Sequence, residues 1–459
     1  MAKPTVSLPQ GTRDFGPETV RKRNYIFSVI KDVFEKYGFQ PLETPAMENL
    51  ETLMGKYGEE GDRLIFKILN NGLSDPAHAD KARAAFEQVC RGKNSKDITE
   101  RALRYDLTIP FARFVAMNHQ RLHFPFRRYQ VQPVWRADRP QRGRYREFYQ
   151  CDADVVGSNS LLNEVELTGI YSEVFDKLGI PVTIKLNNRK VLAALAAAAG
   201  GAEKLTDITV AIDKLDKTGI DKVVAELLAK GLTDSQISLI KKYLDVSGNN
   251  TERLQQIEAL LGHEPLAKEG VAELRWILNF LQATGRGHLP VETDFTLARG
   301  LNYYTGTIFE VKALDVQMGS IGGGGRYNDL TGLFGVPGIP GVGISFGVDR
   351  IYDVLEEKNA FPPGIQSGTD VLFFNLGEKE CQAAFELASG LRATGIRCEL
   401  FHEAVKFDKQ FKYAEKRQIP YVIIIGSQEL ADKRCTIKHL SDGRQESVAF
   451  ENLNEFSFL

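Results

Sequence analysis

Cysteine is scarce in this chain, and neither sign of charge is in surplus. The 459 residues include five cysteines, none of them in a Cys-x-x-Cys pair. This number and spacing argue against a disulfide framework and against a zinc knuckle, and they indicate reduced thiols in the cytoplasm. The formal net charge is −2, from 58 lysines and arginines against 60 aspartates and glutamates. A general attraction to nucleic acid or to a membrane is therefore excluded, and any polyanion must be bound locally.

Long apolar runs are also missing. The longest, the alanine-rich stretch from Val191 to Ala202, is too short to cross a bilayer and contains Gly200 and Gly201. The first residues, MAKPTVSLPQGTRD, hold no apolar segment of the kind that directs export. We therefore expect a protein that is neither exported nor embedded in a membrane. With 43% hydrophobic and 26% charged residues, the composition is typical of a globular chain of this length with about two to four domains.

Strand-forming residues are concentrated in two blocks. Aromatic and β-branched residues are frequent from 103 to 157, where the turn sequence RPQRG predicts two antiparallel strands joined by a long hairpin. A second block runs from 293 to 350, and we expect both blocks to form one sheet. Between them, nearly every window from 189 to 286 has helical periodicity, which predicts a helical insert.

Other segments flank these blocks. Residues 17–37 predict an amphipathic helix, and residues 39–47, broken by two prolines, predict an extended edge strand. Residues 55–100 are polar and predict a surface excursion around two short elements. Beyond a Pro- and Gly-rich linker at 362–368, the pattern becomes βαβαβ with an Asp-Gly hairpin at 442–443, which predicts a compact α/β domain.

The predicted hairpin carries the strongest chemical signal. Residues 135–150, WRADRPQRGRYREFYQ, contain five arginines interleaved with aromatic residues, and only Asp138 and Glu147 balance them. Guanidinium groups bind phosphate and carboxylate oxygens with two hydrogen bonds and stack on flat rings, so this pattern favours a bound nucleoside triphosphate. A solvated, charge-rich edge strand is the alternative. Arg299, inside an apolar and aromatic segment, either faces a ligand or pairs with a buried acid.

Three weaker patterns suggest other chemistry. GISFG at 343–347 matches the serine-hydrolase pattern G-x-S-x-G, but no suitable oxyanion loop is present, and Ser345 is expected to be a small residue in a packed turn. The glycines at 322–325 fit no phosphate-loop motif, and predict either a turn or a wall that a ligand approaches closely. His119 and His123 have the spacing of a metal pair but lack a third ligand.

Three segments together resemble one known family. WRADRPQRGRYREF resembles motif 2 of the class II aminoacyl-tRNA synthetases, GISFGVDR resembles motif 3, and the strand containing Pro45 is placed like motif 1. Within that class, LARGLNYYTGTIFE, the tripeptide at 106–108 and QGTRDF near the start are similar to the histidyl-tRNA synthetases. The resemblance covers nearly the whole chain.

The resemblance implies an α+β fold: an antiparallel-sheet catalytic domain with a helical insertion, followed by a C-terminal α/β anticodon-binding domain. The catalytic core would occupy residues 1–187 and 287–361, the insertion 188–286, and the anticodon-binding domain 368–459. The implied enzyme uses ATP, with Mg²⁺ on the phosphates, to activate L-histidine and to transfer it to the 3′ end of tRNA(His). A homodimer formed through motif 1 and located in the cytoplasm is expected.

The family's site residues carry over onto matching positions. Arg299 and Arg136 would be catalytic: Arg299 would neutralise charge at the α-phosphate, and Arg136 would bind the histidine carboxylate and the α-phosphate. The histidine ring would be held between Asp154 and the hydroxyl of Tyr304, because a neutral imidazole offers one donor and one acceptor. The whole histidine-binding set would be Asp106, Leu107, Thr108, Gln150, Asp154, Tyr303 and Tyr304. The ATP-binding set would be Arg136, Arg144, Phe148 and Arg350, with Phe148 and Arg350 on the two faces of adenine, and no metal is expected to be held by the protein alone.

A function from another class uses the same fold, namely a regulatory or histidine-sensing subunit without catalysis. Such relatives lose the Arg299 segment or the C-terminal domain. This chain keeps both, so the sequence favours the enzyme, although a fold alone does not fix a function.

Overall fold

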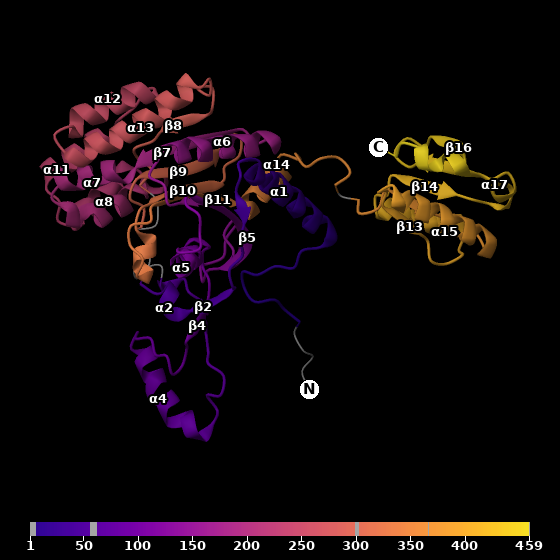
Figure 1. Ribbon diagram of the computed structural model, residues 1–459, viewed down its shortest axis with the longest axis horizontal. Coiled ribbons are helices and arrows are strands. Elements are labelled where there is room, and N and C mark those ends of the chain that lie inside the picture. The colour runs from indigo at the N-terminus through magenta and orange to yellow at the C-terminus, as the bar shows by residue number, and fades with distance from the viewer. Residues whose placement is uncertain (1–5, 56–61, 299–302, 366, 459) are drawn as a thin grey trace. The chain divides into compact units, whose positions relative to one another are not determined.

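The computed structural model places most of the chain in two compact units. The described residues are 6–55, 62–298, 303–365 and 367–458. One unit consists of Met1–Arg13 with Ile26–Ala360, and the other of Asp14–Tyr25 with Phe361–Leu459. The elements of each unit are drawn in Figure 1.

The first unit is built on an eight-stranded sheet with the order β1-β5-β6-β11-β10-β9-β7-β8. Only the pairs β1–β5 and β7–β8 are parallel, and the other neighbours are antiparallel. The prediction that the two strand-rich blocks form one sheet is therefore confirmed. The strands are β1 (Gln40–Pro41), β5 (Phe126–Trp135), β6 (Glu147–Val156), β7 (Val182–Asn188), β8 (Val291–Thr293), β9 (Thr307–Ala313), β10 (Gly322–Tyr327) and β11 (Gly341–Gly347).

The two faces of the sheet differ because successive strand residues point to opposite sides. Phe34 of α1 (Pro17–Lys36) packs on one face, against Tyr129 at 5.6 Å and Phe346 at 5.8 Å between ring centroids. Tyr171 of α6 (Leu162–Lys177) lies 4.9 Å from Phe346 on the same face. Large buried aromatic rings dominate core energetics, so this face is the centre of the core. The opposite face of β5 and β6 carries a row of polar side chains.

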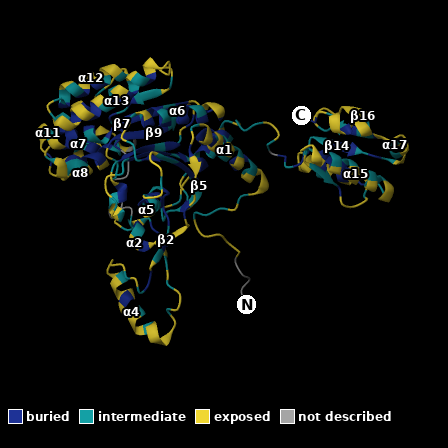
Figure 2. Cartoon of the chain, in the orientation of Figure 1, coloured by how far each residue is buried: buried dark blue, intermediate teal, exposed yellow. Residues whose placement is uncertain are grey.

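The predicted excursion at 55–100 is partly structured. A second sheet, of order β2-β4-β3, joins β2 (Met47–Asn49), β3 (Lys67–Ile68) and β4 (Arg101–Leu103). Helix α4 (Pro76–Cys90) extends beyond it, projects from the body of this unit and is mostly exposed (Figures 1 and 2). The neighbouring helices are α2 (Leu50–Leu53) and α5 (Thr108–Asn118).

The predicted helical insert consists of seven α-helices between β7 and β8. They are α7 (Arg189–Ala198), α8 (Leu205–Ile212), α9 (Leu215–Thr218), α10 (Ile220–Ala229), α11 (Asp234–Leu244), α12 (Asn250–Leu261) and α13 (Pro265–Ala283). Asn249 caps α12, and Thr233 caps α11 in a capping box, which explains where these helices begin. The helices belong to the same compact unit as the sheet, and α13 packs on α6 and β7.

The second unit contains the predicted C-terminal α/β pattern. Its five-stranded sheet has the order β13-β12-β14-β15-β16, with the first three strands parallel and the last two antiparallel. The predicted turn joins β15 to β16, with Gly443 at φ 74°. The elements of this second unit are β12 (Val371–Phe373), α15 (Glu378–Ala393), β13 (Cys398–Leu400), α16 (Phe407–Lys416), β14 (Tyr421–Ile424), α17 (Ser427–Ala431), β15 (Arg434–His439) and β16 (Gln445–Ala449). In the first unit, helix α14 (Val348–Glu357) follows β11. In the part of the chain that the structure describes, no helix has the length and hydropathy needed to span a bilayer.

Candidate active site

The polar row on β5 and β6 forms the floor of the candidate site. Because the two strands are antiparallel neighbours, residues directly opposite one another share a face. The opposed pairs in this row are Arg128 with Asp154, Gln130 with Asp152, and Gln132 with Gln150. Six alternating polar positions on a strand pair would be costly in a core unless they were paired or faced a ligand, so this register already marks a binding surface.

A hollow of about 60 Å³ lies above this floor, between the sheet and the start of α5. Its lining residues are Asp106, Thr108, Arg136, Gln150, Asp152, Asp154, Tyr303, Tyr304, Gly323, Gly324, Tyr327, Gly343, Ile344 and Ser345. A more open hollow of about 310 Å³ shares Arg136, Gln150 and Tyr304 with it and also contains Glu310 and Arg350. The two form a small polar chamber next to a larger cleft.

Asp154 is held at the floor of the small chamber by two partners. The Arg128 guanidinium lies 2.8 Å from Asp154 Oδ2, and both side chains are buried. The hydroxyl of Tyr327 donates to Asp154 Oδ1 at 2.6 Å. Burial raises the pKa of Asp154, whereas Arg128 and the Tyr327 hydrogen bond lower it. The net effect raises the pKa of Asp154, and both partners oppose that shift because they stabilise the ionised form.

Asp152, two residues earlier on β6, has spare hydrogen-bonding capacity. Its side chain is 3% exposed, and its Oδ1 atom has no hydrogen-bond partner among the described residues. Burial raises the pKa of Asp152 to about 7; Arg128 lowers it and the nearby Asp154 raises it. Gln150 Oε1 is likewise without a partner in the described structure, while its Nε2 donates to Ser345 Oγ at 3.2 Å. Unpaired buried acceptors at the wall of a hollow indicate a ligand that donates hydrogen bonds.

The glycines at 322–325 form strand β10 and not a turn, so that one of the two predicted structures is wrong. None of the four has a positive φ. A Cβ atom on Gly322 would meet Tyr171 Cε1 at 2.7 Å, one on Gly325 would meet Tyr304 Cδ1 at 2.8 Å, and one on Gly324 would overlap Gly343 O. Gly323 and Gly324 line the small chamber, which agrees with the other prediction, a backbone wall. Gly322, Gly324 and Gly325 leave no room for a side chain, because strands and aromatic rings pack closely against them.

Two arginines border the larger cleft. Arg136, at the end of β5, donates from Nε to Tyr105 O at 2.8 Å, and its guanidinium lies 5.2 Å from the centroid of the Phe148 ring. Arg350, in the first turn of α14, donates to Gly143 O at 2.9 Å and to Ser320 O at 2.7 Å. Backbone carbonyls thus hold both guanidinium groups at the rim of the cleft. Such fixed cations can bind phosphate oxygens.

The remaining residues of the implied sets lie in different places. Leu107 is fully buried, and its carbonyl accepts from Arg128 Nη2 at 3.4 Å, so it supports the chamber without lining it. Arg144 is half-exposed in the hairpin loop, 3.5 Å from Asp138, and lines neither hollow. Phe148 lies beside Arg136. Arg299 falls outside the described residues.

The alternative chemistries gain no support. Ser345 lies within strand β11 and not in a packed turn, so that expectation is wrong, and its Oγ accepts from the Gln150 amide, not from a histidine. His119 contacts the Ala116 carbonyl at 2.8 Å. Among the residues that the structure describes, no group of three or more His, Cys, Asp or Glu side chains could hold a metal ion.

Three residues of the chamber were missed by sequence reasoning. Asp152 could have been found, because it lies midway between Gln150 and Asp154 on a strand whose period is two. Arg128 could have been found only from the register of the hairpin. Tyr327 of β10 reaches Asp154 of β6 across the one strand between them, β11, and no spacing in the sequence indicates that contact.

Comparisons with known proteins cover nearly the whole chain. Residues 73–351 match a family model described as histidyl-tRNA synthetase, and residues 370–456 match one described as an anticodon binding domain. A histidine–tRNA ligase of Bacteroides fragilis strain YCH46 is 53% identical over 98% of each chain, and one of Porphyromonas gingivalis is 50% identical over 98% of this chain and 97% of its own.

Solved structures show the same fold. The crystal structure of histidyl-tRNA synthetase from Nostoc sp. PCC 7120 superimposes with a TM-score of 0.82 at 30% identity, covering 99% of each chain. A structure from Bacillus halodurans, named as an ATP phosphoribosyltransferase regulatory subunit/histidyl-tRNA synthetase, gives 0.71 at 21% identity over 92% of this chain and 99% of its own. The second likeness shows the fold alone.

Proposed function

The chain belongs to the histidyl-tRNA synthetase family, and from that premise we propose how its residues carry out the reaction. The protein is a histidine–tRNA ligase, which uses ATP to charge tRNA(His) with histidine. The observation that carries this function is the match at 53% identity over 98% of the chain to a histidine–tRNA ligase. The polar chamber that opens into an arginine-lined cleft supports it, because a small substrate and a nucleotide can lie side by side there.

ATP–pyrophosphate exchange, measured with each of the proteinogenic amino acids, tests this function. Exchange is expected with histidine alone. If no amino acid supports exchange, the result would favour the alternative function, a regulatory or histidine-sensing subunit. If a different amino acid supports exchange, the result would contradict the proposed histidine pocket. Because the C-terminal residues match an anticodon-binding model, charging of tRNA should follow activation.

Histidine is proposed to occupy the small chamber. Its ring would lie between Asp154, as acceptor, and the Tyr304 hydroxyl, while Asp106, Thr108, Gln150 and Tyr303 would hold the amino group and close the pocket. Tyr304 keeps its hydroxyl neutral, because burial raises its pKa. A chamber with buried polar groups leaves them unpaired when an apolar amino acid enters, which discriminates by about 10⁴ or more.

ATP is proposed to occupy the larger cleft. Arg136 would contact the histidine carboxylate and the α-phosphate, Phe148 would stack on adenine, and Arg350 would cover its other face and reach the γ-phosphate. Arg144 would contact the outer phosphates from the loop. Arg299 is proposed to neutralise the charge that develops at the α-phosphate as the carboxylate oxygen attacks phosphorus and pyrophosphate leaves.

Mg²⁺ is proposed to accompany the nucleotide. Glu310, 6% exposed, is a carboxylate on the wall of the larger cleft, and its Oε1 accepts from the Ser320 hydroxyl. Oxygen ligands of this kind suit Mg²⁺, which is bound through one or two carboxylates together with substrate phosphates. Glu310 would hold the ion there, and the ion would offset phosphate charge.

The acid pair in the chamber leads to a pH prediction. Asp152 ionises around its pKa of about 7. The carboxylate can then accept a hydrogen bond from histidine, so the KM for histidine should fall between about pH 6 and pH 8 as this group ionises. Asp152→Asn should make the KM for histidine depend less on pH. The pH dependence that is left in this variant reports the titration of the histidine substrate, whose imidazole has a pKa of about 6.5.

Asp154→Ala should raise the KM for histidine without changing the KM for ATP. An effect confined to the KM for ATP would contradict the proposed histidine pocket.

The same pKa fixes the sign of the effect on stability. The folded pKa of Asp152 lies above the unfolded value, so the folded state binds the proton more tightly and loses stability as pH rises from about 4 to about 7. Above that range the cost is on the order of 4 kcal/mol. Asp152→Asn should therefore melt at higher temperature than wild type at pH 8, and the difference should shrink at pH 5. If the variant and the wild type have the same melting temperature at pH 8 as well as at pH 5, folding does not raise the pKa of Asp152.

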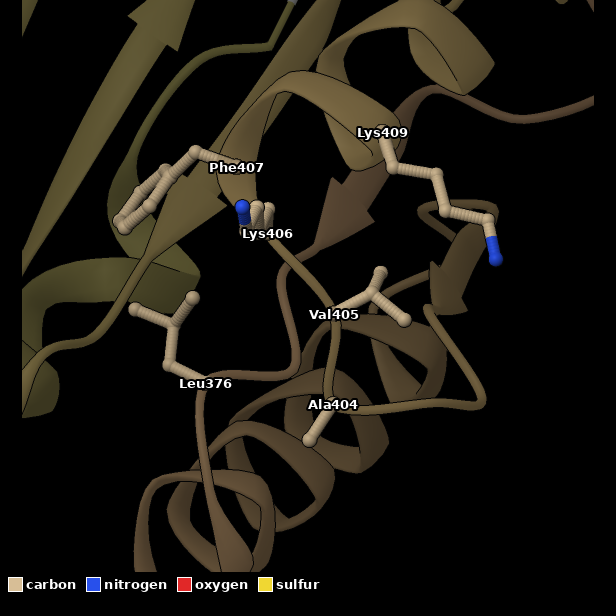
Figure 3. A pocket seen from close by; sticks show the side chains of 6 residues that line it. All are labelled: Leu376, Ala404, Val405, Lys406, Phe407 and Lys409. Atoms are coloured by element: carbon tan, nitrogen blue, oxygen red, sulfur yellow. The ribbon is translucent and has the colours of Figure 1, made fainter.

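The anticodon of tRNA(His) is proposed to bind the second unit. A cleft of about 670 Å³ is lined by Leu376 after β12, by Ala404, Val405 and Lys406 in the segment before α16, and by Phe407 and Lys409 in the first turn of that helix. Figure 3 shows Leu376 and Phe407 on one side of this cleft and Lys409 on the other. An aromatic ring beside flexible ammonium groups suits an unpaired base and its phosphate.

Replacing Lys406 and Lys409 together by alanine is expected to raise the KM for tRNA about threefold to tenfold and to leave pyrophosphate exchange unchanged. Two phosphate contacts would be lost, so the salt dependence of tRNA binding should also become shallower. The matched control replaces Lys412 and Lys416, which lie on the same helix α16 but do not line the cleft. An equal effect of both pairs would mean that the helix meets RNA through general charge and that the cleft reads no base.

The domain organisation, assembly and compartment remain proposals. We assign 1–187 and 287–361 to the catalytic core, 188–286 to the helical insertion and 368–459 to anticodon binding. A homodimer through residues 39–47 is supported by the position of β1 at the edge of the sheet. The cytoplasm is supported by five cysteines that are all free thiols.

A further inference from the structure

The segment before α1 lies against the arginine-rich hairpin loop. Arg146 donates its backbone N–H to Gly11 O at 2.9 Å and its Nη1 group to Gln10 O at 3.3 Å. We call residues 9–13 the N-terminal clasp. These contacts are made to backbone carbonyls and join parts of the chain more than a hundred residues apart, so they depend on how the clasp is folded and not on local sequence.

Arg13 fastens the clasp to two elements at once. Its guanidinium carbon lies 3.2 Å from the centroid of the Tyr145 ring, and its Nη2 group lies 2.6 Å from Asp349 Oδ1 in the first turn of α14. Asp349 is 5% exposed. A planar guanidinium can stack on a ring and pair with a carboxylate simultaneously, which a lysine cannot do in the same way.

Gly11 makes the close approach possible. Its φ is +85°, a conformation that favours glycine, and a Cβ atom there would meet Arg146 Cγ at 2.8 Å and Pro140 Cγ at 2.9 Å. The backbone of the clasp therefore rests directly on the loop, at Pro140 and at Arg146.

The loop under the clasp in turn positions both cleft arginines. Arg136 donates its backbone N–H to Arg146 O at 2.9 Å, and Arg350 donates from Nε to Gly143 O at 2.9 Å. Asp349, which Arg13 contacts, is the residue before Arg350. Each contact of the clasp is thus one residue or one hydrogen bond away from a group proposed to bind ATP.

We propose that the N-terminal clasp is a positioning element for the nucleotide site: Arg13, through Tyr145 and Asp349, holds the loop at 137–146 in the geometry that directs Arg136 and Arg350 into the cleft. This inference rests on the proposed function, in which those arginines bind ATP. Fixing the loop before ATP arrives lowers the entropy lost on binding, and keeps the α-phosphate aligned for attack. Among the residues that the structure describes, the clasp contacts no residue proposed to hold the histidine ring or amino group, and Arg136 is the one arginine it positions that also reaches the histidine carboxylate.

Arg13→Ala is expected to raise the KM for ATP about tenfold and to lower kcat in pyrophosphate exchange, while the KM for histidine stays within about twofold. Hydrogen exchange at 137–146 should become faster in the ligand-free variant and be restored by saturating ATP. Arg13→Lys should recover part of the effect, since it keeps the ion pair but loses the flat stacking. Arg83→Ala, on exposed α4, is the matched control and should behave as wild type.

Asp349→Asn separates positioning from general stability. If Arg13 acts through Asp349, the double variant Arg13→Ala/Asp349→Asn should show less than the product of the two single effects on the ATP KM. Independent effects, an unchanged ATP KM in Arg13→Ala, or an equal rise in both substrate KM values would overturn the inference. A wild-type protein that fails to activate histidine would instead contradict the proposed function, so the two failures are distinguishable.

Discussion

Arg136→Ala is expected to lower the rate of histidine-dependent pyrophosphate exchange by about 100-fold to 1000-fold, with normal folding. A single preorganised donor directed at charge that develops in the transition state is worth about that factor. Arg136 fits this role because it borders both the histidine chamber and the ATP cleft. Its contact with the Tyr105 carbonyl leaves the guanidinium charge unneutralised.

The form of the loss distinguishes catalysis from binding. If Arg136 acts mainly in the transition state, kcat and kcat/KM should fall together, whereas a change in the ATP KM alone would indicate uniform binding. Arg144→Ala is the matched comparison, because this half-exposed arginine of the same loop lines neither hollow. It should raise the ATP KM and spare kcat. Arg299→Ala should lower exchange by more than about tenfold, and unchanged exchange would remove Arg299 from the mechanism.

Arg128→Met is expected to destabilise the protein by about 3 kcal/mol and to raise the KM for histidine by at least about tenfold. Arg128 is fully buried, 2.8 Å from Asp154, and its guanidinium lies 4.2 Å from the centroid of Phe111. Removing one partner of a buried ion pair leaves the other charge uncompensated. Arg128 lowers the pKa of both Asp152 and Asp154, so its loss should raise both and shift histidine binding to higher pH.

Arg127→Met is the control for this experiment. Arg127 is the residue before Arg128 on β5, points to the opposite face and pairs with Glu166 at 2.6 Å, but both groups are partly exposed. Such pairs contribute about 0 to 1 kcal/mol, so this variant should keep its histidine KM. If both variants lose stability equally while the histidine KM stays unchanged, Arg128 is a structural residue and does not tune the chamber.

Most of the fold was predictable because its signals are local. The hairpin of β5 and β6, the helices from 189 to 286 and the βαβαβ pattern near the C-terminus each follow from a hydrophobic period and from turn residues. The glycines at 322–325 misled for the same reason. Glycine is a turn signal in isolation, and only the close approach of Tyr171, of Tyr304 and of neighbouring strand backbone explains Gly322, Gly324 and Gly325 in a strand.

The candidate site was predictable only in part. Gln150 and Asp154 follow the segment that resembles motif 2 and are assigned to histidine by the resemblance, and alternation along β6 would have added Asp152. Three contacts have no such signal: Arg128 with Asp154, Tyr327 with Asp154, and Arg13 with Asp349. The residue numbers of these partners differ by 26, 173 and 336. Sequence separation carries no information about which side chains meet across a sheet.

The amino-acid sequence by itself determined the family, the order of the elements and the concentration of positive charge in one loop of a nearly neutral chain. Tertiary structure alone decided which acids keep a free oxygen, which arginine compensates them and what holds the loop in place. The physical reason is that periodicity and turn chemistry act between near neighbours, whereas burial, pKa and hydrogen-bond partnership depend on strands and segments that the fold brings together from distant parts of the chain.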